Sequence, residues 1–138
     1  MALEMYAFLS TRDLPTVETW QAAIDNLGYS VRLDPELDLK SSTGFSSCTL
    51  ADKPSGFELA IESVAEVSRV YPKIEKIVRG YAWAVCFCWG GDLKECACVT
   101  AAIAGLVACS GAKAYYPADE LWYGLDELRA DFDACMQD

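Results

Sequence analysis

The chain has 138 residues, enough for one domain, and its 53% hydrophobic content can supply a core without metals or disulfides. Its 21 acidic residues outnumber its 11 basic residues, which gives a formal net charge of −10. This charge disfavours binding to nucleic acids or anionic membranes, because both need cationic protein groups. The absence of histidine excludes Ser-His-Asp and Cys-His catalysis and every histidine-ligated metal site.

The N-terminus and the cysteines predict a cytoplasmic protein. Glu4 places a negative charge where a secretory signal would be positive. Seven cysteines cannot all pair within one chain, and free thiols are typical of a reducing compartment. The most apolar run, 96–109, is shorter than the ~20 residues that a membrane span needs. We therefore expect it to form a buried core helix.

The first half of the chain predicts several strands and one helix. Residues 3–9 are apolar on both faces, which is typical of a buried strand. Pro15 and Thr16 suit the start of a helix, and Gly28 suits its end. The pattern then predicts strands at 29–33, 46–50 and 57–62, a loop at 34–44 and a turn at 53–56.

The second half alternates helices and strands. Residues 64–78 have helical spacing that Pro72 interrupts. Asp92, with Glu95 three residues later, predicts a capping box at the start of a helix over 93–109. The remaining elements are strands at 81–89 and 112–116, a turn at 117–124 with a short extended piece at 121–123, and a closing helix from Leu125.

This order of elements lacks regular βαβ alternation in its middle. Runs of strands with interspersed helices are typical of an α+β fold. We expect one globular domain over 1–138, with a single mixed or antiparallel sheet and about three helices packed on it.

Four cysteines lie in the stretch 86–98, CFCWGGDLKECAC. Cys86 and Cys88 share one face of a strand, but Cys96 and Cys98 lie ~200° apart around a helix and cannot reach one metal ion. The C-x-C spacing also differs from the redox motif C-x-x-C. We interpret the cysteines as packing residues. The small strand face (Ala82, Ala84, Cys86, Cys88) is expected to pack against the alanine-rich helix, and we assign no catalytic residue, metal ligand or cofactor.

The other face of the same strand carries large aromatic residues, which have two interpretations. They pack in the core against the first helix through Trp20, or some are exposed near the turn at 90–91 as interface anchors. The residues of this row are Tyr81, Trp83, Phe87 and Trp89.

Acidic residues gather in the segment 117–138, where only Arg129 is basic. Trp122 and Tyr123 lie among them, a combination that suits a basic protein surface, although a solvated helix face would show the same composition. The carboxylate pair Glu58 and Glu62 would lie about 13 Å apart along a strand, farther than glycosidase pairs require.

The stretches LPTVETWQAAIDNLG, SGFEL, CFCWGGDLKECAC and GAKAYYPADELW resemble those of a group of small acidic bacterial proteins. In size and charge the chain also resembles immunity proteins, which neutralise bacterial toxins. The second resemblance implies a stoichiometric inhibitor that covers the site of a basic toxin domain. The residues expected to bind this partner are Trp122, Tyr123, Asp119, Glu120, Trp89, Asp34, Glu36 and Asp38.

Two other functions stay open at this point. One is a self-associating structural or adaptor module, in which the aromatic row forms the seam of a homodimer. The other is a small enzyme with a cysteine or carboxylate catalyst, although the sequence leans away from an enzyme. Rapid alkylation of Cys86 or Cys96 with loss of activity would favour the enzyme.

Overall fold

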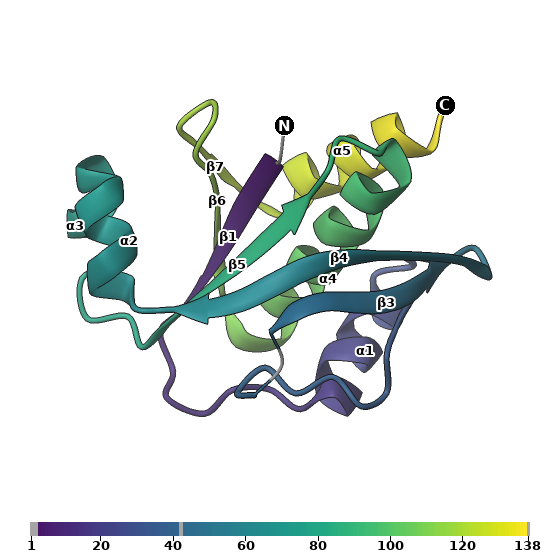
Figure 1. The fold of residues 1–138 in the computed structure, drawn as a ribbon, viewed down its shortest axis with the longest axis horizontal. Helices are drawn as coiled ribbons and strands as arrows, with labels where there is room; N and C mark the ends of the chain where they lie inside the picture. Colours follow the sequence, from purple (N-terminus) through teal and green to yellow (C-terminus); the bar gives the residue numbers. More distant parts are fainter. Residues whose placement is uncertain (1–2, 42, 138) are drawn as a thin grey trace.

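The computed structural model describes residues 3–41 and 43–137 (Figure 1). It confirms the α+β class, with one antiparallel seven-stranded sheet in the order β2-β3-β4-β5-β1-β6-β7. The strands are β1 (Leu3–Leu9), β2 (Val31–Leu33), β3 (Gly44–Leu50), β4 (Lys53–Glu62), β5 (Trp83–Trp89), β6 (Lys113–Tyr116) and β7 (Leu121–Tyr123). The helices are α1 (Val17–Asn26), α2 (Val64–Val70), the 3₁₀ helix η1 (Pro72–Ile74), α3 (Glu75–Val78), α4 (Leu93–Ser110) and α5 (Leu125–Met136).

The number of helices is higher than the expected three. Residues 64–78 form α2, η1 and α3 because Pro72 begins a new helical turn after Tyr71 leaves the helical conformation. The extended piece 121–123 is a strand, β7, which pairs with β6 and forms one edge of the sheet.

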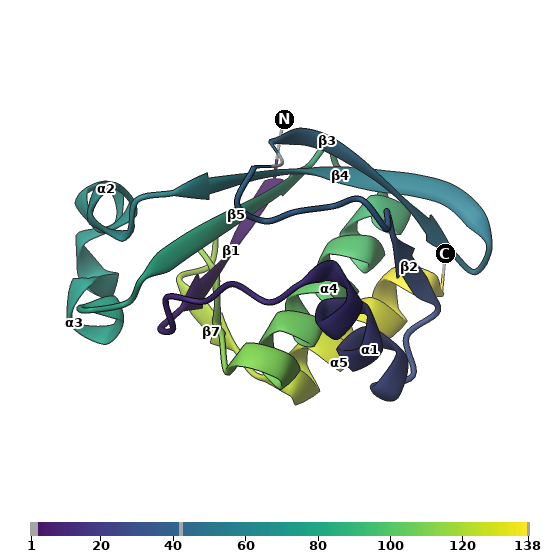
Figure 2. The same ribbon diagram turned by 90° about the horizontal axis from the view of Figure 1, so that it is seen from below.

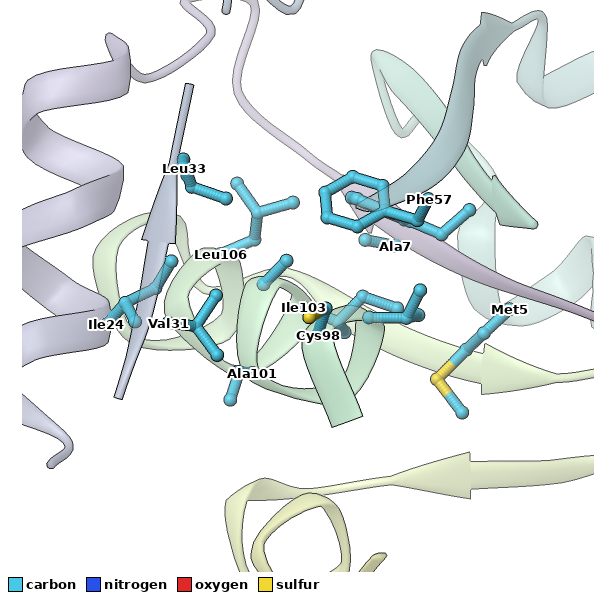
Figure 3. Close-up of a cluster of buried hydrophobic side chains, with 14 of the residues drawn as sticks. Met5, Ala7, Ile24, Val31, Leu33, Phe57, Cys98, Ala101, Ile103 and Leu106 are labelled. Atoms are coloured by element: carbon cyan, nitrogen blue, oxygen red, sulfur yellow. The ribbon is translucent and has the colours of Figure 1, made fainter. Parts of the chain in front are cut away.

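The helices cover the two faces of the sheet unequally. Helices α1, α4 and α5 lie under one face, whereas α2 and α3 lie apart from them at one end of the sheet (Figures 1 and 2). Helix α4 is the centre of the main layer, and every residue from Ala97 to Leu106 is buried. Figure 3 shows side chains from β1, β2, β4, α1 and α4 meeting in this core. The apolar run at 96–109 is thus part of a core helix, as expected, although the length and mean hydropathy of the whole helix Leu93–Ser110 alone would also suit a membrane span.

Strand β5 faces α4 with the opposite side from the one expected. Val85, Phe87 and Trp89 belong to the core that contains α4. Ala84 and Cys86 belong to the smaller cluster on the other face of the sheet. The expected packing of small strand residues on small helix residues was wrong, because large side chains fill the space above an alanine-rich helix better than small ones do.

Trp20 packs α1 against this core and contacts one residue of the aromatic row. Its ring meets the Phe87 ring edge-on, with centroids 6.2 Å apart. A Cβ atom on Gly105 would lie 2.6 Å from Ile24 Cγ1 and 3.0 Å from Trp20 Cδ1, so glycine permits this close approach. The core interpretation is confirmed for Phe87 and Trp89, whereas Tyr81 precedes β5 and packs, half-buried, against the smaller cluster.

The β3–β4 turn lies earlier than the sequence predicted. Ala51 and Asp52 form it with φ angles of 50° and 65°, the left-handed conformation of a two-residue hairpin turn. Residues 53–56, expected to be the turn, begin β4 instead. Pro54 is tolerated because β4 pairs only with β3 there, so its missing N–H breaks no ladder to β5.

The start of α4 matches the predicted cap only in part. Asp92 accepts a 2.8 Å hydrogen bond from the Lys94 amide, as an N-cap residue should. Glu95, however, accepts from the amide of Gly90 at 3.3 Å. Glu95 therefore fastens the Gly90–Gly91 connection to the helix, and this contact takes the place of the predicted capping box.

Candidate functional site

The residues predicted to bind a partner do not form one surface. Asp34, Glu36 and Asp38 follow β2, whereas Trp122 and Tyr123 lie in β7. These strands are opposite edges of the sheet, and six spacings of ~4.8 Å separate them by roughly 29 Å. Asp34 and Asp38 each accept a 3.0 Å hydrogen bond from a backbone amide two residues later, so they shape their own loop.

Trp89 is excluded as an interface anchor. Only 6% of its surface is exposed, and it lies in the main core. The turn at Gly90–Gly91 is exposed, but it does not carry the indole outward. The physical reason is the face of β5 on which Trp89 lies, since that face is directed at α4.

The β6–β7 hairpin directs the remaining predicted residues to different faces. Trp122 lies on the α2 side, where its ring is 4.7 Å from the Tyr115 ring. Glu120 forms a 3.0 Å ion pair with Lys73 of η1. Tyr123 packs on the α4 side. Neighbouring strand residues point to opposite faces, so Trp122 and Tyr123 do not share one face of the sheet.

One group of predicted and unpredicted residues does converge, and we call it the C-terminal acidic patch: Tyr116, Asp119, Tyr123 and Asp131. The Tyr116 and Tyr123 rings are 6.2 Å apart. Burial and the charges of Asp131 and Asp119 raise the pKa of Tyr123 to about 12. Burial also raises the pKa of Asp131, opposed by its interaction with the Tyr123 hydroxyl and reinforced by Asp119. Aromatic rings and carboxylates therefore share one partly desolvated surface.

Arg129 does not neutralise this patch. Its guanidinium lies 4.0 Å from the centre of the Tyr29 ring and donates a hydrogen bond to the Leu27 carbonyl. It therefore fastens α5 to the end of α1. Among the described residues of segment 117–137, it is the sole cation.

A second cluster lies on the opposite face of the sheet, and the sequence did not predict it. Cys86 and Cys88 of β5 have sulfur atoms 3.6 Å apart, and Cys86 Sγ is 3.6 Å from Glu4 Oε2. We call Glu4, Cys86 and Cys88 the thiol–carboxylate cluster. Glu4 is 82 residues from Cys86 in sequence, and only the β1–β5 pairing, which sets Glu4 opposite Cys88, brings them together.

This cluster opens into a hollow of about 420 Å³. Glu58 and Glu62 of β4 line it, with Glu58 opposite Cys88 in the β4–β5 register. The described residues that line the hollow include no lysine or arginine. The hollow is therefore a strongly anionic surface with thiols at its base.

Six of the seven cysteines lie in three separate pairs, one of which is Cys86 and Cys88. Cys98 contacts Cys48 of β3, and Cys96 contacts Cys135 of α5. Cys96 and Cys98 thus have different partners, in keeping with their expected separation of ~200° around the helix. Burial, Cys88 and the nearby carboxylates raise the pKa of Cys86, so it is a protonated thiol and a weak nucleophile at neutral pH.

No protein-family model matches the chain, and comparisons with curated proteins and with solved structures also found no match. The function must therefore follow from the chemistry of the C-terminal acidic patch and of the thiol–carboxylate cluster.

Proposed function

We propose that this protein is a stoichiometric inhibitor that binds a basic protein domain and covers its working surface, as immunity proteins do with toxins. The observation that supports this most strongly is the C-terminal acidic patch, where Asp119 and Asp131 flank two tyrosine rings. A cytoplasmic location belongs to the same proposal, because seven free cysteines are typical of a reducing compartment.

The patch has the composition of a protein interface. Tyrosines supply rigid contact area, and carboxylates around them select a cationic partner. Leu121, on the same side of β7 as Tyr123, is 49% exposed and adds an apolar contact. β7 is also an edge strand with unpaired backbone groups on its outer side. A partner can therefore bury apolar surface at the centre and pair charges at the rim.

The surrounding charge would speed the encounter. Helix α5 adds exposed carboxylates at Asp126, Glu127 and Asp133. An excess of one charge sign accelerates association with an oppositely charged partner, and salt weakens this acceleration. We therefore expect binding to slow steeply as ionic strength rises.

The test is capture of a basic protein from the source organism with the immobilised chain, followed by identification of that protein. Asp119→Lys/Asp131→Lys should reduce its affinity at least tenfold, by reversing two charges next to the anchors. Asp13→Lys/Glu18→Lys is the matched control, because it makes the same charge change at exposed positions away from the patch. The captured protein should be toxic when expressed alone and harmless when co-expressed with the wild-type chain.

Equal loss of affinity in both double variants would contradict a specific patch and leave only non-specific charge attraction. A captured protein whose toxicity is unaffected by co-expression would contradict the inhibitor function itself. Both results are independent of the thiol–carboxylate cluster on the other face of the sheet.

The two alternatives have less support. A homodimer seam on the aromatic row would need Phe87 and Trp89, which are buried within one chain. A cysteine nucleophile would need a thiolate, which the raised pKa of Cys86 disfavours. For the homodimer alternative, we expect light scattering to give a monomeric mass. For the enzyme alternative, we expect slow alkylation of the folded protein, and rapid alkylation of Cys86 would support the enzyme hypothesis.

A further inference from the structure

The thiol–carboxylate cluster has donors from two strands on one face of the sheet. Cys86 and Cys88 are two residues apart in β5, so both side chains leave the same face. Glu4 lies opposite Cys88 in the neighbouring strand β1. The three candidate donor atoms lie within 4.8 Å of one another. Backbone pairing in the middle of the sheet thus fixes the positions from which these side chains project.

The separations of the donors match those around a tetrahedral metal ion. With bonds of about 2.3 Å to sulfur and about 2.1 Å to oxygen, two sulfurs lie about 3.8 Å apart and a sulfur and an oxygen about 3.6 Å apart. The Cys86–Cys88 sulfur separation is 3.6 Å, and Cys86 Sγ is 3.6 Å from Glu4 Oε2. Cys86 can therefore share one ion with either partner after shifts of a few tenths of an ångström, and the Cys88 sulfur and the Glu4 carboxylate lie within 4.8 Å of each other.

A further residue holds the carboxylate in place. The Tyr71 hydroxyl donates a 2.6 Å hydrogen bond to Glu4 Oε1. The other oxygen, Oε2, is the one that faces Cys86. Hydrogen bonding of one carboxylate oxygen so that the other can coordinate is the usual outer-shell arrangement of metal sites. Tyr71 lies at the junction of α2 and η1, so this helical segment also serves the cluster.

The surroundings favour a cation that prefers sulfur. Glu58 and Glu62 add negative charge to the hollow, and the part of its lining that the structure describes contains no basic side chain. Thiolate ligands select zinc and similar ions over magnesium or calcium, which prefer oxygen. Cys88 is half-buried at the hollow, so a fourth position can face solvent.

We propose that Glu4, Cys86 and Cys88 bind a zinc ion, with Tyr71 positioning the carboxylate and the fourth position directed into the hollow. Each thiol loses its proton to solvent as its sulfur bonds to the metal, so binding releases two protons and changes no oxidation state. The site is independent of the proposed inhibitor function, because the cluster and the C-terminal acidic patch lie on opposite faces of the sheet.

The test uses reduced, metal-free protein titrated with cobalt(II), whose absorption reports thiolate ligation and tetrahedral geometry, followed by displacement with zinc. We expect one equivalent to bind with a thiolate-to-cobalt charge-transfer band. Cys86→Ser and Cys88→Ser should abolish that band. Glu4→Gln and Tyr71→Phe should keep part of the charge-transfer band but bind cobalt more weakly. For Tyr71→Phe we expect the affinity for cobalt to fall by about 10–100-fold.

Two controls make the test specific. Cys109→Ser removes a half-buried thiol outside the cluster and should bind cobalt like the wild type. Asp119→Lys/Asp131→Lys should also bind cobalt normally, which separates this inference from the inhibitor proposal. Circular dichroism should show that every variant is folded.

The proposal is overturned by folded wild-type protein that shows no thiolate band. It is equally overturned if the band survives in Cys86→Ser and disappears in Cys48→Ser or Cys96→Ser, because another thiol pair would then hold the metal. A Cys86–Cys88 disulfide that reforms at once after reduction and blocks cobalt binding would also contradict it.

Discussion

The indole nitrogen of Trp20 in α1 donates a 2.7 Å hydrogen bond to the carbonyl oxygen of Ala102 in α4, across 82 residues of sequence. Both residues are buried, and the same indole lies against Gly105 and Phe87. The contact therefore fixes α1, α4 and β5 in one arrangement. Its strength is testable by stability measurements that do not require a known partner.

Trp20→Phe should lower the free energy of unfolding by about 2 kcal/mol, since it removes a buried hydrogen bond worth about 1 kcal/mol and leaves unfilled volume. Urea unfolding followed by circular dichroism measures the change. Trp83→Phe is the matched control, because its indole hydrogen bond to the Arg12 carbonyl is exposed. Equal losses in the two variants would show that the buried hydrogen bond contributes no more to stability than the exposed one.

Gly105→Ala should destabilise the fold by about 1–3 kcal/mol despite the better helix propensity of alanine. The added Cβ would lie 2.6 Å from Ile24 Cγ1, in a core that has little room to relax. Gly90→Ala is the control, as no heavy atom lies within 4 Å of its added Cβ. Thermal unfolding should show a lower midpoint only for Gly105→Ala. A stabilised Gly105→Ala would contradict the close packing of α1 on α4.

Ala51→Gly should stabilise the protein by about 0.5–1 kcal/mol. Ala51 has a φ of 50°, and a left-handed alanine costs about 1–2 kcal/mol, partly offset by the greater freedom of glycine in the unfolded chain. Ala22→Gly, on an exposed position of α1, should instead destabilise by about 1 kcal/mol. Chemical denaturation of both variants gives the comparison. A loss of stability in both would mean that the hairpin turn is not where the structure places it.

Asp131→Asn should stabilise the protein more at about pH 7 than in acid. Burial raises the pKa of Asp131 in the folded state, so the folded state keeps this proton to a higher pH than the unfolded state does. Stability from this group is therefore present below the unfolded pKa and is lost as pH rises through the folded pKa. Urea unfolding of the variant and the wild type, from acid pH to about pH 7, measures the difference in their free energies of unfolding.

Asp126→Asn provides the control for that experiment, because it removes one negative charge from an exposed position of the same helix. Its stability difference from the wild type should vary less with pH. If the two variants show the same pH dependence, the effect comes from net charge and the environment of Asp131 does not contribute.

Local sequence signals determined most of the secondary structure of this protein. Such signals include the apolar residues of 3–9, the Asp92 cap and the glycine at position 111. They act on the nearest residues of the backbone, so the strand and the helix ends can be predicted without knowing the tertiary structure. The two-residue turn at Ala51–Asp52 was missed because neither residue is typical of a left-handed conformation.

The orientation of β5 could not be decided from its own residues. Both of its faces are apolar, so periodicity shows that the faces differ in size but not which one meets α4. The helix of alanines beneath it, with Gly105 admitting Trp20, selected the large face. The same choice buried Trp89 and removed it from the predicted interface.

The candidate sites were decided by pairings between distant strands. The acidic composition of the C-terminal segment was evident in the sequence, but the alternation of β7 separated Trp122 from Tyr123, and α5 brought Asp131 beside Tyr123. Glu4 met Cys86 only because β1 pairs with β5 in a particular register. Sequence by itself determined the elements and the charge, since these are local or additive. Tertiary structure alone decided which side chains share a surface, because the register between distant strands depends on the packing of the whole sheet.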